Sequence, residues 1–150
     1  MKTRLNESKF SITTFGGLSR SALMSKVRST GNATTELKLM SLLRKAGVTG
    51  WRRNYPLAGK PDFVFPKCRL VVFVDGCFWH GHNCRNLSAK QNAKFWRRKI
   101  AATKLRDKRN SRRLRAAGWN VIRIWECGLE KRSAACMARI QNFVAKSLGI

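Results

Sequence analysis

The stretch RLVVFVD, from Arg69 to Asp75, is a nearly continuous apolar run that ends in an acid. An apolar run without polar alternation is typical of a strand that is buried on both faces. A shorter strand is predicted at Asp62–Phe65, because a Gly-Lys-Pro turn precedes it and Pro66 ends it. We therefore expect these two strands at the centre of a layered domain.

Helical and further strand signals lie on either side of this pair. A helix is predicted from Thr34–Glu36, where threonine and an early acid suit a helix N-terminus, to Gly47, which supplies a stop. The other predicted elements are a polar edge strand at residues 50–57, a long helix at about 92–117, a strand at 119–126 and an amphipathic helix at 133–147. The order helix, three strands, helix, strand, helix predicts a mixed α/β sandwich.

The chain of 150 residues, 43% of them hydrophobic, has the size and composition of one folded domain. We expect that domain at residues 21–150, after a basic flexible arm at residues 1–20 that shows no clear period. No stretch approaches the roughly 18 consecutive apolar residues of a membrane span, and the basic N-terminus has no apolar signal-peptide core. We therefore expect a cytoplasmic, nucleoid-associated protein without a membrane partner.

Positive charge dominates the composition, with 32 Lys and Arg against 7 Asp and Glu and a formal net charge of +25. Nucleic acid is the partner that this charge favours, because neutralising phosphates releases condensed counterions. A membrane surface, an acidic protein or a merely soluble basic protein could also explain charge alone. Between Arg85 and Arg115 there are 13 bases and a single acid, whereas only two bases lie between Pro61 and Cys84. Basic segments around a less basic centre predict phosphate contacts that flank a catalytic site.

The segment GCFWHGHNC, residues 76–84, holds both histidines of the chain and two of its five cysteines. Thiolates and imidazoles together suit tetrahedral zinc, and an odd cysteine count in a chain that looks intracellular disfavours disulfides. The alternative is that these are buried free cysteines. We expect His80 to stay free for another task, and Cys68 and Cys136 to pack as small apolar side chains. The four expected zinc ligands are Cys77, His82, Cys84 and Cys127.

Two acids stand at the ends of the central strands. Asp62 begins the first strand and Asp75 ends the second, so in a hairpin the two carboxylates would lie near each other at the sheet rim. Mg²⁺ takes oxygen ligands of this kind together with substrate phosphates. A turn, a helix cap or an ion pair is the alternative role for each acid.

Asp107 shares one helix face with Trp96, Ile100 and Leu114 at about 100° per residue. An inward carboxylate needs a partner. His80 is a candidate, since an aspartate can fix the tautomer of an imidazole. The alternative is an ion pair with a nearby arginine of the same helix.

Together these residues resemble the very-short-patch repair (Vsr) endonucleases, a branch of the restriction-endonuclease-like nucleases. The resemblance covers about residues 18–130 and implies a three-layer sandwich with a mixed central sheet and a structural zinc ion. The matching strings are GKPDFV (59–64), VVFVDGCFWHGHNC (71–84), FWRRKI (95–100), RDKRN (106–110), AGWNV (117–121) and WEC (125–127), with LMSKV (23–27) and Glu36 near the start.

The resemblance also implies roles for the residues of the site. Asp62 resembles the principal Mg²⁺ ligand, with the carbonyl oxygen of Val74 as a further ligand. His80 resembles the catalytic histidine that activates water or assists the leaving oxygen. Glu36 and Asp107 complete the site as acids that orient water and the histidine. The four Cys and His ligands match the structural zinc site of the family.

Aromatic and basic residues of this chain match the DNA contacts of the family. Phe78, Trp79 and Trp96 resemble an aromatic wedge that enters the base stack beside a T:G mismatch, with core packing as the alternative. For Phe95 we expect core packing. The other expected DNA contacts are Met24, Arg97, Arg98 and Lys99.

Asp75 departs from the pattern of the family, whose members often carry a histidine or another residue at this position. An acid here resembles the second metal-binding acid of ordinary nucleases of this fold. It is therefore a further candidate Mg²⁺ ligand. Cys77 occupies the position of the usual catalytic lysine, which is consistent with proton transfer by His80.

The leading hypothesis is a monomeric endonuclease that nicks double-stranded DNA at T:G mismatches and works with other repair proteins. A second hypothesis is a Vsr-like nuclease of a mobile or defence element that cuts both strands without mismatch dependence. A third is a non-catalytic, zinc-stabilised DNA-binding module.

Overall fold

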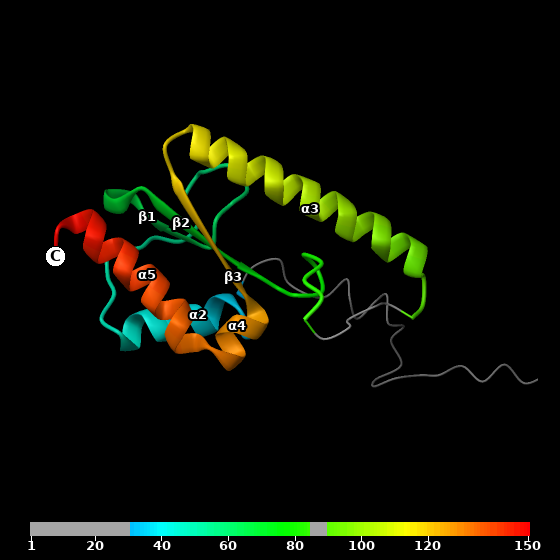
Figure 1. The fold of residues 1–150 in the computed structure, drawn as a ribbon, viewed down its shortest axis with the longest axis horizontal. Helices are drawn as coiled ribbons and strands as arrows, with labels where there is room; N and C mark the ends of the chain where they lie inside the picture. The colour runs from blue at the N-terminus through cyan, green and yellow to red at the C-terminus, as the bar shows by residue number, and fades with distance from the viewer. Residues whose placement is uncertain (1–30, 85–89) are drawn as a thin grey trace, which may run out of the picture. The chain divides into compact units, whose positions relative to one another are not determined.

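The computed structural model describes residues 31–84 and 90–150, and the predicted basic arm and Met24 lie outside these ranges. Its sheet has three strands in the order β1–β2–β3 (Figure 1). Strand β1 (Phe63–Phe65) pairs antiparallel with β2 (Leu70–Asp75), and β2 pairs parallel with β3 (Asn120–Trp125). The predicted hairpin and mixed sheet are therefore confirmed, with the short 3₁₀ helix η1 (Pro66–Cys68) as the hairpin connection.

Four α-helices accompany the sheet in the described part of the chain. They are α2 (Glu36–Lys45), α3 (Ala93–Ala116), α4 (Glu126–Lys131) and α5 (Ser133–Leu148). Helices α2, α3 and α5 confirm the predicted helices within a few residues. Helix α4 was not predicted, because six residues are too few to show a 3.6-residue period.

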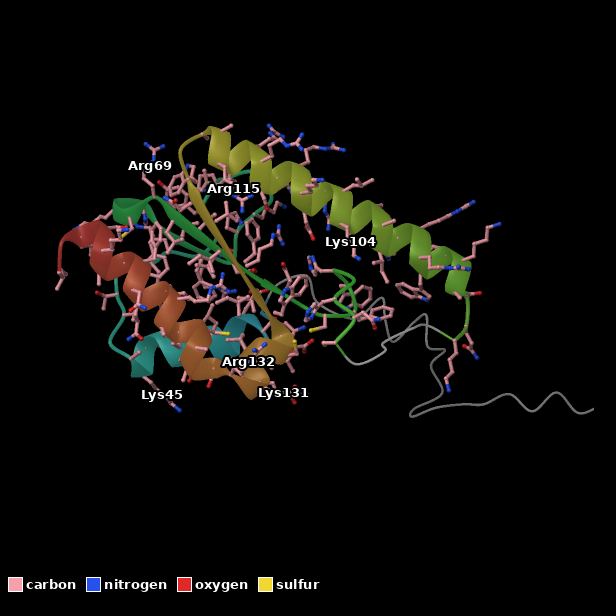
Figure 2. The ribbon with its side chains drawn as sticks, viewed as in Figure 1. Lys45, Arg69, Lys104, Arg115, Lys131 and Arg132 are labelled. Atoms are coloured by element: carbon pink, nitrogen blue, oxygen red, sulfur yellow. The ribbon has the colours of Figure 1, made fainter. Side chains whose placement is uncertain are left out.

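Basic side chains extend from these helices and from the loops between them (Figure 2). Lys45 lies on α2, Lys104 and Arg115 on α3, and Lys131 on α4. Helix α3 alone carries eleven Lys and Arg residues and one Asp. None of the helices within the described ranges combines the length and the apolar character needed to cross a membrane.

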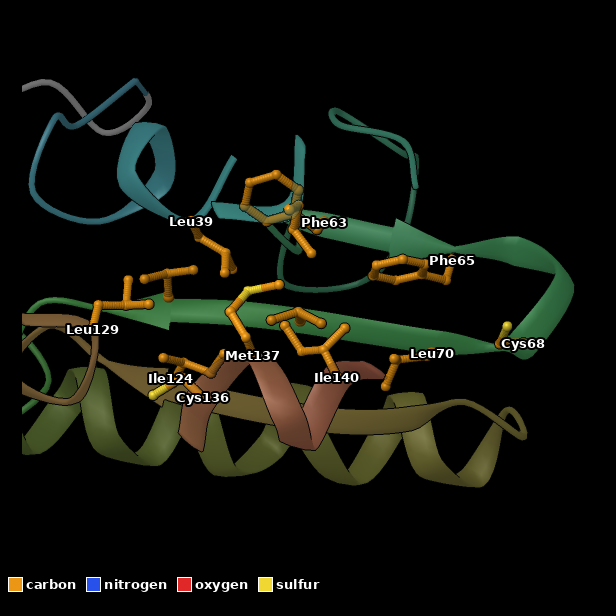
Figure 3. Packing of buried hydrophobic residues seen from close by; sticks show 13 residues of the cluster. Leu39, Phe63, Phe65, Cys68, Leu70, Ile124, Leu129, Cys136, Met137 and Ile140 are labelled. Carbon is orange, nitrogen blue, oxygen red and sulfur yellow. The ribbon is translucent and has the colours of Figure 1, made fainter. Parts of the chain in front are cut away.

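Alternation along the strands divides the core into two clusters, one on each face of the sheet. On one face, α2, α4 and α5 cover the even-numbered residues of β2 and β3 (Figure 3). Leu39, Leu129 and Ile140, one from each helix, are fully buried there. Leu70, Val72, Val74 and Ile124 are the strand residues that they meet.

On the other face, α3 contributes Leu114 to a smaller cluster with Val64, Val71 and Phe73. Only Ser111 and Leu114 of α3 are buried, so the helix rests on the sheet through its C-terminal half. Helices on both faces of the sheet make a three-layer arrangement. The odd-numbered residues of β2 and β3 point to the α3 side, which places Asp75 and Arg123 on that side.

The predicted edge strand at residues 50–57 is wrong. The segment makes one isolated bridge, between Arg52 and Val64. Asn54 has a left-handed φ of 53°, and Pro56 has no N–H to donate, so the segment cannot continue a ladder. At the start of α2, Thr35 is the N-cap residue but makes no side-chain capping hydrogen bond.

Candidate active site and metal centre

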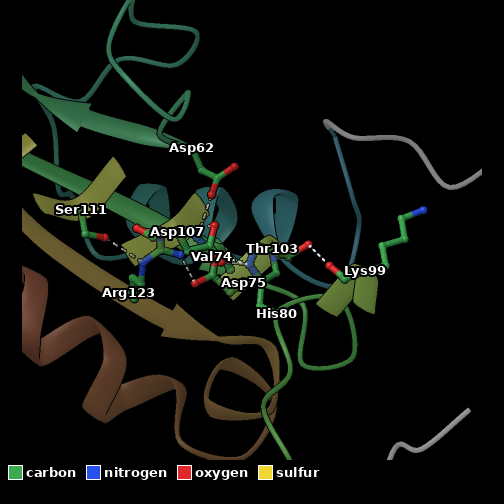
Figure 4. Close-up of polar contacts among 9 residues, drawn as sticks. All are labelled: Asp62, Val74, Asp75, His80, Lys99, Thr103, Asp107, Ser111 and Arg123. Carbon is green, nitrogen blue, oxygen red and sulfur yellow. Dashed lines mark hydrogen bonds and ion pairs between the residues drawn. The ribbon is translucent and has the colours of Figure 1, made fainter. Parts of the chain in front are cut away.

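Asp62 lies at the rim of the sheet, where the antiparallel hairpin brings the start of β1 to the end of β2 (Figure 4). Its Oδ2 atom accepts a hydrogen bond from the backbone N–H of Val74 at 2.7 Å. Asp75 follows Val74 directly and is 3% exposed. The predicted proximity of the two aspartates is therefore confirmed.

The surroundings of Asp62 disfavour its ionised form. Burial, followed by the negative charges of Glu36 and Asp75, raises the pKa of Asp62 from 3.8 to about 6, against the opposing effects of the Val74 N–H and Arg53. Glu36 is itself buried and pairs with Arg53. Three carboxylates thus gather at one rim, and this rim can offer oxygen ligands to a hard cation.

His80 meets Asp107 across the gap between the loop after β2 and helix α3. The distance between His80 Nδ1 and Asp107 Oδ2 is 2.6 Å, and Asp75 Oδ1 lies 3.6 Å from the same nitrogen. Burial alone would raise the pKa of Asp107, but the hydrogen bond and charge of His80, together with Arg123 and Arg106, hold it below its usual value. The predicted partnership of His80 and Asp107 is confirmed.

Arg123 is a member of this group that the sequence did not indicate. Its Nη1 lies 2.5 Å from Asp75 Oδ2, and its Nη2 lies 3.7 Å from Asp107 Oδ1. The signal was an arginine between isoleucines in a strand, but such a residue is more often placed on an exposed face. Asp75 lies between the two parts of the site: its charge acts on Asp62, and its carboxylate faces His80 and Arg123.

A cleft of about 460 Å³ opens beside His80 on the α3 side of the sheet. Acids and bases both line it, so an anion in the cleft would meet positive charge close to the imidazole. Asp62 is outside this lining. The charged residues of the lining are Asp75, Lys104, Asp107, Lys108, Arg115 and Arg123.

A second cluster, built from three cysteines and a histidine, joins the loop after β2 to α4. Cys77, His82, Cys84 and Cys127 each offer one ligand atom, and these atoms lie within 4.8 Å of one another. The predicted set of ligands is brought together by the parallel pairing of β2 and β3, because Cys127 lies in the first turn of α4, directly after β3. The His82 ring stacks on Trp125 at a centroid distance of 4.3 Å, which fixes its plane.

The cysteines of this cluster lie apart from Cys68 and Cys136. Burial, followed by contacts with Cys84 and Cys127, raises the pKa of Cys77 to about 12. A metal binds thiolate and releases the proton, so the group can hold a soft or borderline cation. Cys68 and Cys136 belong to the main core cluster, which confirms their predicted apolar packing.

Four aromatic side chains, two from the loop that carries His80 and two from the start of α3, form a separate cluster. Phe78, Trp79 and Trp96 are in mutual edge contact, with ring centroids 5.3 to 5.6 Å apart. The ammonium group of Lys99 lies 5.3 Å from the centre of the Trp96 ring. Phe95 also contacts Trp96 but is 57% exposed, so the prediction that it packs in the core is wrong. The basic residues Arg97, Arg98 and Lys99 are exposed on α3.

Comparison with known proteins relates this arrangement to DNA cleavage. A family model described as "DNA mismatch endonuclease Vsr" matches residues 14–86. The chain is 42% identical over 129 residues to the type II nicking enzyme V.XorIIP of Xanthomonas oryzae pv. oryzae, covering 85% of this chain and 93% of that protein. It is 38% identical over 104 residues to the DNA mismatch endonuclease Vsr of Escherichia coli K12, covering 69% and 67%. A third relative is the type II nicking enzyme V.NmeAIP of Neisseria meningitidis, 36% identical over 126 residues, covering 83% and 89%.

The site and these similarities define the class of the protein, which is a DNA endonuclease, a hydrolase of phosphodiester bonds. The identity above 40% over nearly the whole length of a nicking enzyme narrows this class to one family. The chain belongs to the Vsr endonuclease family.

Proposed function

We propose that the protein nicks one strand of double-stranded DNA 5′ to the thymine of a T:G mismatch, by Mg²⁺-dependent hydrolysis, and so starts very short patch repair. The observation that carries the proposal is the 2.6 Å contact of His80 with Asp107 beside the carboxylates of the sheet rim. The name of the E. coli relative supports a mismatch as the substrate, and the names of two further relatives support cleavage of one strand. A restriction-endonuclease-like fold and action as a monomer are part of the proposal.

Asp62 and the carbonyl oxygen of Val74 are the proposed Mg²⁺ ligands, and Asp75 is the remaining candidate at this rim. The donor set fits the ion, because the ligands are oxygens and the half-buried Asp62 lies near the negative charges of Glu36 and Asp75, which add to the effect of burial in raising its pKa. Bound Mg²⁺ would stabilise charge on the scissile phosphate and acidify water. Glu36 is proposed to orient water near Asp62.

His80 is proposed to move the proton. With the Nδ1 proton held by Asp107, the Nε2 atom keeps its lone pair and can accept a proton from the attacking water. The water oxygen then forms the new bond to phosphorus while the ester oxygen leaves. The leaving oxygen takes a proton from solvent; in the alternative role, a protonated His80 gives it that proton.

The Cys/His cluster is proposed to hold a structural zinc ion. Four closed ligands, three of them sulfur, suit zinc in a tetrahedral site with no position open for chemistry. Two of these ligands, Cys77 and His82, bracket Phe78, Trp79 and His80 in the chain. Zinc would therefore keep the catalytic histidine and the aromatic wedge in place.

The aromatic cluster is proposed to select the mismatch. Inserting aromatic side chains into a duplex costs a few kcal/mol of unstacking, and the cost is least at a weakened pair. Phe78, Trp79 and Trp96 are proposed to enter the stack, while Arg97, Arg98 and Lys99 contact phosphates. The proposed contact of Met24 lies outside the described residues.

A second candidate function is cleavage of both strands by a Vsr-like nuclease of a mobile or defence element. Asp75, an acid at the position of the second metal ligand of ordinary nucleases, is the observation that favours it. The non-catalytic module has less support, since the named relatives are enzymes.

A single experiment separates these candidates. A duplex library with a central T:G pair and randomised flanking bases is labelled on both strands, and a library with T:A at the same position is its control. Proposed mismatch nicking gives Mg²⁺-dependent product from the T strand of the T:G library alone. Product from both strands, or equal product from the T:A library, would support the second candidate.

A further inference from the structure

Arg123 connects three elements of the active site that are distant in the chain. From β3, its Nη1 lies 2.5 Å from Oδ2 of Asp75 on β2. Its Nε donates to Ser111 Oγ at 3.3 Å, and its Nη2 donates to the carbonyl oxygen of Asp107 at 3.5 Å, both on α3. The guanidinium carbon lies 4.4 Å from the centre of the Phe73 ring, so a cation–π contact also holds the planar group.

Asp75 has both of its carboxylate oxygens engaged. Oδ2 faces Arg123 at 2.5 Å, and Oδ1 faces the Nδ1 atom of His80 at 3.6 Å. The residue is 3% exposed, although it forms part of the lining of the cleft beside His80. A metal that bound Oδ2 would have to displace a charged guanidinium, and a metal at Oδ1 would lie between Asp75 and the His80 ring.

Two carboxylates lie near the Nδ1 atom of His80, and either could accept its proton. Asp107 Oδ2 lies 2.6 Å from the Nδ1 atom, within hydrogen-bond distance, and Asp75 Oδ1 lies 3.6 Å from it. Arg123 binds Asp75 through the oxygen that is remote from the imidazole, and it also lies 3.7 Å from Asp107 Oδ1. One guanidinium group therefore faces both acids at once through its two Nη atoms, and a single ammonium group could do this only in part.

We propose that Arg123 is a positioning residue that keeps His80 on Asp107 and keeps Asp75 away from the catalytic metal. Asp75 then serves as the counter-ion of Arg123, and Asp62 is the aspartate that binds Mg²⁺. The inference rests on the proposed function, because it assigns a role within the proposed nicking reaction.

The test compares Arg123→Met, Arg123→Lys and Asp75→Asn with the wild-type protein. Single-turnover nicking of a T:G duplex is measured across a Mg²⁺ titration, and duplex affinity is measured without Mg²⁺ by fluorescence anisotropy. Arg69→Met is the matched control, since Arg69 also stacks on an aromatic ring and bonds a carbonyl, but at the opposite end of β2. Thermal unfolding checks that each variant folds.

Arg123→Met lowers the maximal nicking rate by about 10- to 100-fold, the range for partners that orient ligands and catalytic groups. Duplex affinity and the half-saturating Mg²⁺ concentration stay unchanged, which a general loss of structure would not produce. Arg123→Lys restores part of the rate. Asp75→Asn keeps the wild-type Mg²⁺ requirement, and adding it to Arg123→Met recovers part of the lost rate, because the competing charge is gone.

The inference is overturned if Asp75→Asn abolishes nicking or raises the half-saturating Mg²⁺ concentration, since Asp75 would then be a metal ligand. It is equally overturned if Arg123→Met nicks at the wild-type rate. If Arg123→Met does not fold, the Mg²⁺ titration of Asp75→Asn decides alone. A wild-type protein that nicks no duplex would refute the proposed function itself, and this inference with it.

Discussion

The Nδ1 atom of His80 lies 2.6 Å from the Oδ2 atom of Asp107, although 27 residues separate them in the chain. The loop after β2 carries the histidine, and the inner side of α3 carries the aspartate. Such a contact holds one imidazole tautomer and leaves the second ring nitrogen for proton transfer. The position of helix α3 on the sheet therefore decides which tautomer His80 adopts.

Asp107→Asn is expected to slow nicking while duplex affinity stays the same. The amide can donate to Nδ1, which favours the tautomer whose Nε2 carries the proton and cannot accept another. The expected loss lies within about 10²- to 10⁴-fold, the range for general acid–base catalysis. Single-turnover rates on a T:G duplex measure it, with Glu130→Gln on α4 as the control for loss of one acid. A wild-type rate for Asp107→Asn would contradict the role of the pair.

Asp62→Asn is expected to stabilise the fold at neutral pH. The folded-state pKa of about 6 exceeds the ordinary value of 3.8, so the folded state binds more protons between these values. Stability contributed by the protonated carboxyl is present below about pH 4, falls as pH rises to about 6, and stays lost above that. Asparagine can still accept the Val74 N–H, so it removes the charge and keeps the hydrogen bond.

The expected gain above pH 6 is at most about 3 kcal/mol, at about 1.4 kcal/mol per pKa unit, and it vanishes near pH 4. Urea unfolding of both proteins without added Mg²⁺, at a series of pH values, measures the difference. A variant that is less stable than the wild type by the same amount at every pH would refute the cause given for the shift.

Cys127→Ser is expected to lose a bound zinc ion and much of the stability. The variant breaks a cluster whose ligand atoms lie within 4.8 Å of one another. The free energy of unfolding should fall on the order of 4 kcal/mol or more, because loss of a metal belongs to the severe class of substitutions. Elemental analysis and urea unfolding measure both effects, with Cys68→Ala as the control. Zinc content equal to that of the wild type would exclude Cys127 as a ligand.

Trp79→Ala is expected to reduce discrimination between T:G and T:A duplexes. Stacking of an aromatic side chain on a base contributes about 1–3 kcal/mol, so the ratio of nicking rates should fall by about tenfold or more. Trp51→Phe is the matched control, because Trp51 packs against Phe63 in the core. If the ratio is unchanged and both rates fall alike, Trp79 only supports the loop.

Much of the site could be predicted from sequence because its signals are local. The apolar run 70–75 predicts a central strand, and the turns around Asp62 predict the hairpin that brings it to Asp75. The Cys and His residues of 77–84 lie within eight positions, so their convergence needs one loop. Only Cys127 required a long-range pairing, that of β2 with β3.

The remaining features depend on tertiary packing that no local pattern reports. Helix α3 spans about 36 Å at 1.5 Å per residue, whereas β2 spans about 20 Å. The helix therefore extends beyond the sheet, and Phe95 finds no core to pack in. The role of Arg123 likewise depends on α3 covering the odd-numbered residues of β3, which the sequence of the strand alone does not indicate.

The central claim is that the carboxylate of Asp62 and the imidazole of His80 serve one reaction. Single-turnover nicking by Asp62→Asn, by His80→Ala and by the double variant tests it most directly. Residues that act as a unit are strongly non-additive, so the double variant should be about as slow as the slower single variant. Full activity in either single variant, or losses that multiply in the double variant, would contradict the account.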